Sequence, residues 1–193
     1  MAGSSTPEVS KHEPRSDDMR AELVRAALTV LQRDGAAGLT VRNITAEAGC
    51  STTGVYTYFG GKQGVVEAIF VQGFESFDAA VSPALVAGDL VAAGRAYRRW
   101  ALDNRTQYMV MFGRAVPDYV PSAAARERAL MSFARLADGV QRASPGDDHA
   151  ERAYHLFATV HGYVMLEMAE MSTATDAESE ALYERALRTL GRT

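Results

Sequence analysis

The chain has 193 residues, a net charge of -4 and a pI near 5.6, so it lacks the basic balance typical of nucleic-acid-binding proteins. An apolar share of 47% and a charged share of 23% argue against disorder as the default state. A single cysteine, Cys50, excludes an internal disulfide, and the absence of a secretory signal or an apolar run of roughly 18 residues predicts a cytoplasmic protein with no membrane partner.

The first residues of the chain predict a flexible tail. Residues 1–15 are polar, contain Pro7 and Pro14, and show no periodicity. Lys11 and Arg15 would allow this tail to act as a DNA-contacting arm, but nearby acidic residues offset their charge. A solvated tail is therefore the favoured interpretation.

A first amphipathic helix is predicted to follow the tail. Ser16 or Asp17 can cap it, because a short oxygen-bearing side chain satisfies the free amides of a first helical turn. Apolar residues then recur at helical spacing from Leu23 to Leu31, and Gly35 ends the run.

Two short helices joined by a tight turn are predicted between Leu39 and Lys62. Thr40 can cap the first of them, and Gly49 ends it because glycine accepts the left-handed conformation common at helix ends. Ser51 can cap the second. This is the outline of a helix-turn-helix, whose second helix can enter a DNA major groove.

The rest of the chain predicts helix after helix, with no alternating strand pattern. A long fourth helix starts at Lys62, and the segment from Ser82 to Gly88, which includes Pro83, interrupts the helical pattern. Further helices are predicted at residues 89–104, 106–112, 122–143, 148–171 and 176–190. The chain is thus expected to be all-α, with about nine helices.

No catalytic, cofactor or metal site is predicted. The sequence has no Gly-x-Ser-x-Gly elbow, no phosphate-binding glycine loop and no His-Glu-x-x-His motif. Glu151 and His155 lie one helical turn apart, but two ligands are too few for a metal, and an exposed charged pair is favoured.

His161 lies in the middle of the most apolar helix and needs a hydrogen-bond partner. Burying an imidazole without one costs roughly 1–3 kcal/mol. Both a protein group and a ligand in a pocket satisfy this need, and the sequence does not choose between them.

Residues between Arg20 and Ile69 resemble the TetR family of transcriptional regulators. The matching positions are Ala26-Ala27, Gly35, Leu39-Thr40-Val41, Ile44, Ala48-Gly49, Ser51, Gly54, Tyr56, Phe59 and Lys62. A weaker resemblance to one C-terminal class of the family rests on residues 97–101, 108–113 and Val160-His161-Gly162, where Val160 replaces a usual Trp. The resemblance implies a tail at 1–15, a helix-turn-helix DNA-binding domain at 16–62, and a helical ligand-binding and dimerisation domain at 63–193.

The resemblance also implies which residues contact DNA. Phosphate contacts are expected from Thr40, Ser51, Tyr56, Tyr58 and Lys62, and Arg42 is added because of its outward place on the second helix. Base contacts fall to Thr52, Thr53 and Gly54 on the third helix. Packing is the alternative role for Tyr56, and a plain surface lysine is the alternative for Lys62.

A candidate ligand pocket is expected in the C-terminal domain. Its residues are large, polarizable or aromatic: Tyr97, Trp100, Tyr108, Met109, Phe112, Phe157, His161 and Met165. Helical spacing alone also places most of them in the core.

The predicted function is that of a homodimeric regulator, expected to be a repressor, that binds a palindromic DNA operator. An apolar or aromatic small-molecule effector would release it, and the last two helices, about residues 148–190, would pair with a second subunit. The alternative is a helical small-molecule carrier or sensor whose helix-turn-helix is vestigial.

Overall fold

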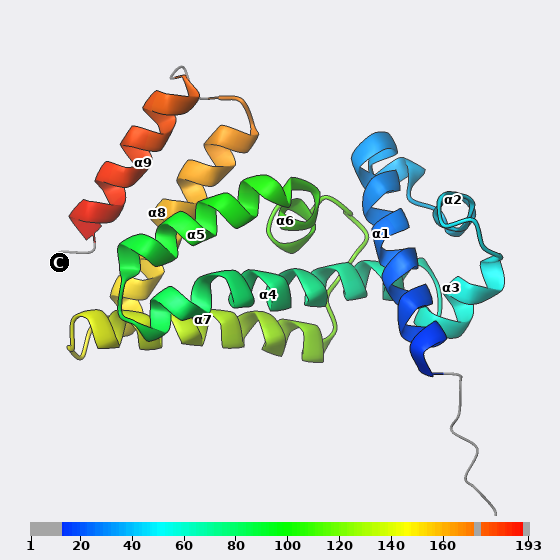
Figure 1. The fold of residues 1–193 in the computed structure, drawn as a ribbon, viewed down its shortest axis with the longest axis horizontal. Coiled ribbons are helices and arrows are strands. Elements are labelled where there is room, and N and C mark those ends of the chain that lie inside the picture. The colour runs from blue at the N-terminus through cyan, green and yellow to red at the C-terminus, as the bar shows by residue number, and fades with distance from the viewer. Residues whose placement is uncertain (1–12, 172–174, 191–193) are drawn as a thin grey trace, which may run out of the picture. The chain divides into compact units, whose positions relative to one another are not determined.

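The computed structural model describes residues 13–171 and 175–190, and every regular element in these two ranges is a helix (Figure 1). In chain order they are α1 (Glu13–Gly38), α2 (Val41–Glu47), α3 (Thr52–Phe59), α4 (Lys62–Val86), α5 (Leu90–Asp103), α6 (Arg105–Met111), α7 (Ala123–Ala143), α8 (His149–Met168) and α9 (Asp176–Leu190). The prediction of an all-α fold is confirmed. None of the described helices has the length and apolar character that crossing a bilayer requires.

The start of α1 differs from the prediction. The helix begins at Glu13, so the expected cap at Ser16 or Asp17 is wrong. Pro14 is compatible with this start, because in a first turn its missing N–H costs no intrahelical hydrogen bond. Most of the predicted tail, residues 1–12, lies outside the described residues.

Gly35 interrupts α1 at the predicted place. Its φ of 66° and ψ of -169° break the helical geometry, and a last short helical segment then runs to Gly38. A positive φ is a conformation that glycine adopts readily and other residues rarely. Gly35 therefore redirects the chain towards α2.

The chain divides into two compact units, one ending at Ala68 and one beginning at Ile69, so the division falls inside α4. The first unit packs α1, α2 and α3 around fully buried side chains that include Leu23, Ile44 and Val55. Phe59, whose spacing from Val55 also predicts a core position, is only partly buried. This core fixes the direction in which α3 presents its other face.

The second unit is built around α8, which contacts α5, α7 and α9 (Figure 1). A β-carbon added at Gly139 of α7 would lie 2.8 Å from Leu85 Cδ2 of α4, and Ser132 of α7 donates a hydrogen bond to Asp78 of α4. The two contacts follow the same chain order, so these helices run parallel and side by side. Arg98 of α5 forms a bidentate ion pair with Glu167 of α8, with nitrogen–oxygen distances of 2.7 and 3.0 Å.

The predicted interruption at Ser82 and Pro83 is wrong, because α4 continues to Val86. Pro83 is exposed, while Val81 and Leu85 on either side of it are buried. Burial of these flanking residues holds the helix through a proline that lies close to its end. The helix stops instead before Gly88, which has a φ of 71°.

The C-terminal end of α8 is also earlier than expected. The helix ends at Met168 rather than Met171, and Glu170 has a φ of 53°. A left-handed residue so close to the end closes the helix.

Candidate functional site

The α3 helix exposes hydroxyl-bearing side chains opposite its buried residue. Val55 is fully buried, whereas Thr53 is exposed and Tyr56 is 60% exposed. Thr52 and Thr57 are exposed as well. Thr57 was not among the predicted contacts, although its spacing of one helical turn from Thr53 would have identified it.

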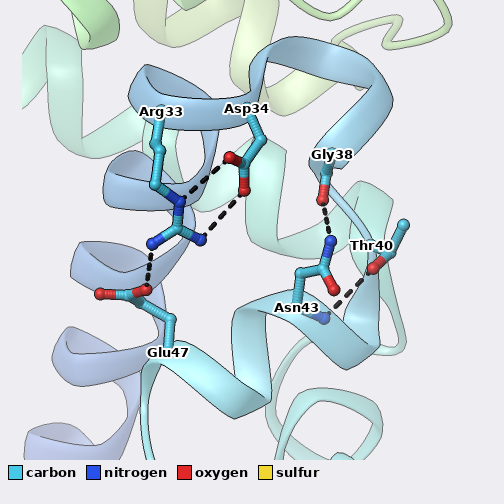
Figure 2. Close-up of polar contacts among 6 residues, drawn as sticks. All are labelled: Arg33, Asp34, Gly38, Thr40, Asn43 and Glu47. Carbon is cyan, nitrogen blue, oxygen red and sulfur yellow. Dashed lines mark hydrogen bonds and ion pairs between the residues drawn. The ribbon is translucent and has the colours of Figure 1, made fainter.

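The Thr40 cap on α2 is confirmed. Its hydroxyl accepts a hydrogen bond from the Asn43 backbone N–H at 3.1 Å, and the Asn43 side-chain amide donates to the Gly38 carbonyl at 2.8 Å (Figure 2). These bonds tie the first turn of α2 to the end of α1.

Ser51 occupies the cap position of α3 without a capping hydrogen bond from its side chain, so that part of the prediction is wrong. Its backbone has the usual cap geometry, with φ -80° and ψ 156°. The difference therefore lies in the orientation of the hydroxyl. Ser51 is exposed, and its oxygen remains able to bond a group outside the helix.

A charge cluster joins α1 to α2 beside this cap (Figure 2). Arg33 Nη1 donates to Glu47 Oε2 at 2.8 Å, and Arg33 Nε donates to Asp34 Oδ1 at 3.0 Å. The hydrogen bond from Arg33 holds the pKa of Asp34 below its usual value. The guanidinium thereby offsets the negative charge of two carboxylates where α1 meets α2.

The remaining predicted DNA contacts lie on different parts of the first unit. Arg42 is exposed on α2, and Lys62 is the first residue of α4. Within the described chain, neither side chain forms an ion pair with an acidic residue. No carboxylate of the described chain neutralises the positive charges of Arg42 and Lys62, so both can attract an anion.

Gly54 and Tyr58 lie on the part of α3 that faces α1. A β-carbon at Gly54 would be 3.8 Å from Leu23 Cδ1, an ordinary van der Waals distance. The guanidinium carbon of Arg20 lies 5.5 Å from the centre of the Tyr58 ring, and Tyr58 is half-buried. The Tyr58 ring therefore packs against α1, and Gly54 leaves room there for a small side chain.

A largely apolar cavity of about 380 Å³ lies in the second unit. Its wall is formed by side chains of α4, α5, α7 and α8 together with Phe112 after α6. Val160, which stands where the resembling family class usually has Trp, is part of this wall. The cavity suits an apolar molecule.

The predicted pocket residues divide between the wall and the packing behind it. Tyr97, Phe112 and Phe157 line the cavity. The other predicted residues are not part of the wall: Trp100, Tyr108, Met109, His161 and Met165. Trp100 instead packs against the wall residue Phe77, with 5.4 Å between ring centroids.

His161 has its partner inside the protein. The Tyr108 hydroxyl lies 2.6 Å from His161 Nδ1, and the Tyr97 hydroxyl lies 2.7 Å from that of Tyr108. Burial lowers the pKa of His161 and raises the pKa of Tyr108 to about 12. At neutral pH the imidazole is therefore neutral and the phenol keeps its proton.

Asp78 is a buried acid that the sequence analysis missed. Its Oδ2 accepts hydrogen bonds from Arg128 at 2.7 Å and Arg135 at 2.8 Å, and its Oδ1 accepts one from Ser132. A lone acid on an apolar helical stripe was the available signal, together with Arg128, Ser132 and Arg135 on one face of the predicted helix 122–143.

Glu151 and His155 form an exposed pair 3.6 Å apart, as the sequence predicted. In the described ranges no group of three or more metal-ligating side chains comes together.

Two family models match the chain. A model for the tetracyclin repressor-like C-terminal domain matches residues 90–190, and a model for bacterial regulatory proteins of the tetR family matches residues 23–69. Both matches are consistent with the resemblance found in the motif residues.

Curated relatives include HTH-type transcriptional regulators of mycobacteria. Rv1816 of Mycobacterium tuberculosis is 28% identical over 121 residues, which is 59% of this chain and 52% of the relative. Mb1846 of Mycobacterium bovis gives the same values. The chain therefore matches about half the length of these curated relatives.

Solved structures share the fold over nearly the whole chain. The crystal structure of regulatory protein SCO4313 has a TM-score of 0.82 at 25% identity and covers 96% of this chain and 98% of that one. A TetR-family regulator from Mesorhizobium loti has a TM-score of 0.70 at 16% identity, covering 91% and 96%, and shows the fold alone. Since the C-terminal model alone matches residues 90–190, more than half of the 193 residues, the chain belongs to the TetR family of bacterial regulatory proteins.

Proposed function

We propose that this protein is a transcriptional repressor that binds a palindromic DNA operator as a homodimer and is released by an apolar or aromatic small molecule. The exposed hydroxyl face of α3, opposite the buried Val55, is the observation that carries the proposal. A short helix fixed from behind, with small polar side chains in front, fits a major groove.

Positioning on the duplex falls to groups on α3 and on the elements around it. In this proposal Thr40, Ser51, Tyr56, Tyr58, Lys62 and Arg42 contact phosphates. Tyr56 and Arg42 have the clearest support, because both side chains are exposed on the first unit. Tyr58 has the least, because its ring already packs under Arg20.

Base contacts fall to Thr52, Thr53 and Gly54, and Thr57 joins them. Threonine offers a methyl group for contact with thymine and a hydroxyl for hydrogen bonding. No bidentate reader of guanine or adenine lies on α3. The helix-turn-helix domain of one subunit therefore discriminates only modestly between DNA sequences. The fixed spacing of the two domains in a dimer supplies the remaining specificity.

Dimerisation is proposed through α8 and α9, at about residues 148–190. Leu166 on α8 is 52% exposed and Leu182 on α9 is 41% exposed. Burying such side chains against a second copy would add hydrophobic stabilisation. The dimer would present two α3 helices to successive major grooves, roughly 34–36 Å apart or at a related spacing.

Release is proposed to follow from occupancy of the cavity. Its wall includes Phe74, Phe77 and Val81 of α4, the same helix that begins at Lys62. A ligand that binds one conformation more tightly shifts the population towards it. The coupling equals the difference in ligand affinity between the two conformations.

Fluorescence anisotropy with palindromic and scrambled duplexes tests the DNA-binding claim. We expect preference for the palindrome, weakened about tenfold or more by Arg42→Ala or by Tyr56→Ala, since a hydrogen bond to a charged group contributes about 1.5–3 kcal/mol. Arg99→Ala is a matched control, because Arg99 is an exposed arginine on α5. Equal binding of both duplexes by every variant would refute the claim.

The alternative of a helical carrier rests on the apolar cavity. If the protein is a carrier, replacing Tyr56 and Lys62 should leave its ligand binding unchanged. Val160→Trp separates the two ideas, because a large side chain at this wall position fills the cavity. A repressor with Val160→Trp should bind DNA and resist release, whereas a carrier should lose its only function.

A further inference from the structure

An exposed arginine of α1 lies over two aromatic rings of α3. The guanidinium carbon of Arg20 is 5.5 Å from the centre of the Tyr58 ring and 5.4 Å from the centre of the Phe59 ring. Both distances are within the roughly 6 Å over which an aromatic face attracts a cation. The two rings are half-buried, whereas Arg20 is exposed. The rings therefore provide a fixed support for a side chain that faces solvent.

The packing of α1 on α3 places Arg20 at the C-terminal end of α3 (Figure 1). Leu23 of α1 is fully buried, and a β-carbon added at Gly54 would lie 3.8 Å from its Cδ1. Arg20 is about one helical turn before Leu23 on α1. Tyr58 is about one turn after Gly54 on α3. Arg20 thus lies at the end of α3 that is opposite its N-terminal threonines.

The charge of Arg20 is not neutralised within the described chain. No hydrogen bond or ion pair joins its guanidinium to a residue of the described ranges, including the exposed Asp17 one turn earlier. Other arginines of α1 differ in this respect. Arg25 pairs with Glu22 at 2.5 Å, and Arg33 is held by two carboxylates. Arg20 therefore keeps both its positive charge and its N–H donors for a partner outside the chain.

A guanidinium group can contact an aromatic ring and a phosphate at the same time. Its face packs on the ring, while its N–H donors form a planar fork that matches the oxygens of a phosphate. Contact with the rings also restricts the motion of the long arginine side chain. Less conformational entropy is then lost when the phosphate binds.

We propose that Arg20 is a further DNA contact of the first unit, which binds a backbone phosphate beside the C-terminal end of α3, and that the Tyr58 ring positions it. A phosphate is the expected partner because Arg20 belongs to α1 and not to the helix that reads the bases. The contact adds a cation to those of Arg42 and Lys62 in a chain whose net charge is -4. This inference rests on the proposed binding of DNA through α3.

Fluorescence anisotropy of the full chain at several salt concentrations tests the inference. The probes are a duplex that the protein selects from a random pool and a duplex of mixed sequence. A phosphate contact carries no sequence information, so Arg20→Gln should weaken binding to both duplexes by a similar factor, about tenfold. It should also lower the slope of log Kd against log salt by about 0.9 for each bound chain. Arg25→Gln is the matched control and should leave affinity and slope unchanged, because Glu22 already offsets the charge of Arg25.

Conservative changes separate a DNA contact from a structural role. Arg20→Lys keeps the charge but loses the planar fork, so it should restore the salt slope and only part of the affinity. Tyr58→Leu removes a ring beneath Arg20 and should weaken binding several-fold, but it should have no further effect in the Arg20→Gln background. Tyr58→Phe keeps the ring and should weaken binding less than Tyr58→Leu. Far-UV circular dichroism checks that each variant is folded.

The inference would be overturned if Arg20→Gln had the affinity and salt slope of Arg25→Gln. A weaker affinity with an unchanged slope would overturn it as well, because a purely structural role has that effect. Equal losses in Tyr58→Phe and Tyr58→Leu would overturn the positioning role of the ring. A preferred duplex bound normally by Arg20→Gln refutes only this inference. The absence of any preferred duplex refutes the regulator, while the mixed-sequence duplex still tests Arg20, and a lack of binding to both duplexes refutes both claims.

Discussion

Replacing Asp78 with asparagine tests the buried charge cluster between α4 and α7. Asp78 is 6% exposed and accepts hydrogen bonds from two arginines and a serine. Asparagine keeps the shape but removes the charge, so two guanidinium groups lose their counter-ion. Breaking a buried pair costs about 3–5 kcal/mol when the remaining charge is fully buried.

The two arginines are partly exposed, so the expected loss of stability is smaller than this. The Arg128 side chain is 20% exposed and that of Arg135 is 40% exposed, so water screens the second more than the first. We therefore expect Asp78→Asn to lower the free energy of unfolding by about 2–3 kcal/mol. In double-mutant cycles, Asp78 should couple more strongly to Arg128 than to Arg135.

Urea unfolding monitored by Trp100, the single tryptophan of the chain, measures this loss in the second unit. Glu75→Gln is the matched control, because Glu75 is an exposed acid on the same helix, and its effect should stay within about 0.5 kcal/mol. All variants are compared at one protein concentration, since dimerisation would add to stability. Equal effects of Asp78→Asn and Glu75→Gln would refute the reasoning.

Three further predictions concern the caps, Gly54 and His161. Thr40→Ala should destabilise the first unit by about 1 kcal/mol, whereas Ser51→Ala, which removes no capping bond, should cost much less, as measured by urea unfolding followed by far-UV circular dichroism. Gly54→Ala should stabilise the chain by about 0.5–1 kcal/mol, since its β-carbon meets Leu23 at an ordinary distance, yet weaken DNA binding in an anisotropy assay if α3 approaches the bases closely. Burial lowers the pKa of His161 in the folded protein. As the pH falls through about 6.5, the imidazole is therefore protonated in the unfolded chain before it is protonated in the folded one. The free energy of unfolding falls over this range and levels off below the folded-state pKa. Chemical unfolding between pH 7.5 and 5 should show a smaller decline for His161→Phe than for the native protein.

Local features were predictable because local chemistry sets them. Thr40 caps α2 through the next turn of its own helix, and Gly35 and Gly49 mark chain reversals that need positive φ. Helical periodicity identified the all-α fold for the same reason. Pro83 misled the prediction, because burial of its neighbours in the tertiary structure outweighed a local helix breaker.

The sequence predicted a C-terminal pocket and three of its wall residues, but the rest of the wall and the partners of Asp78 depend on which helices lie side by side. Asp78 meets Ser132 only through the parallel packing of α4 and α7. Leu136 of α7 and Phe74 of α4 line the cavity, yet their sequence pattern does not differ from that of any buried helix face. The partner of His161 is likewise 53 residues away in sequence, on α6.

Selection from a pool of random DNA duplexes tests the central claim most directly. A homodimer that presents two α3 helices should enrich an inverted repeat, with half-sites separated by a distance compatible with successive major grooves. The mass of the recovered complex should correspond to an even number of chains per duplex. Enrichment of no sequence, or of a single unrepeated half-site bound by one chain, would contradict the account.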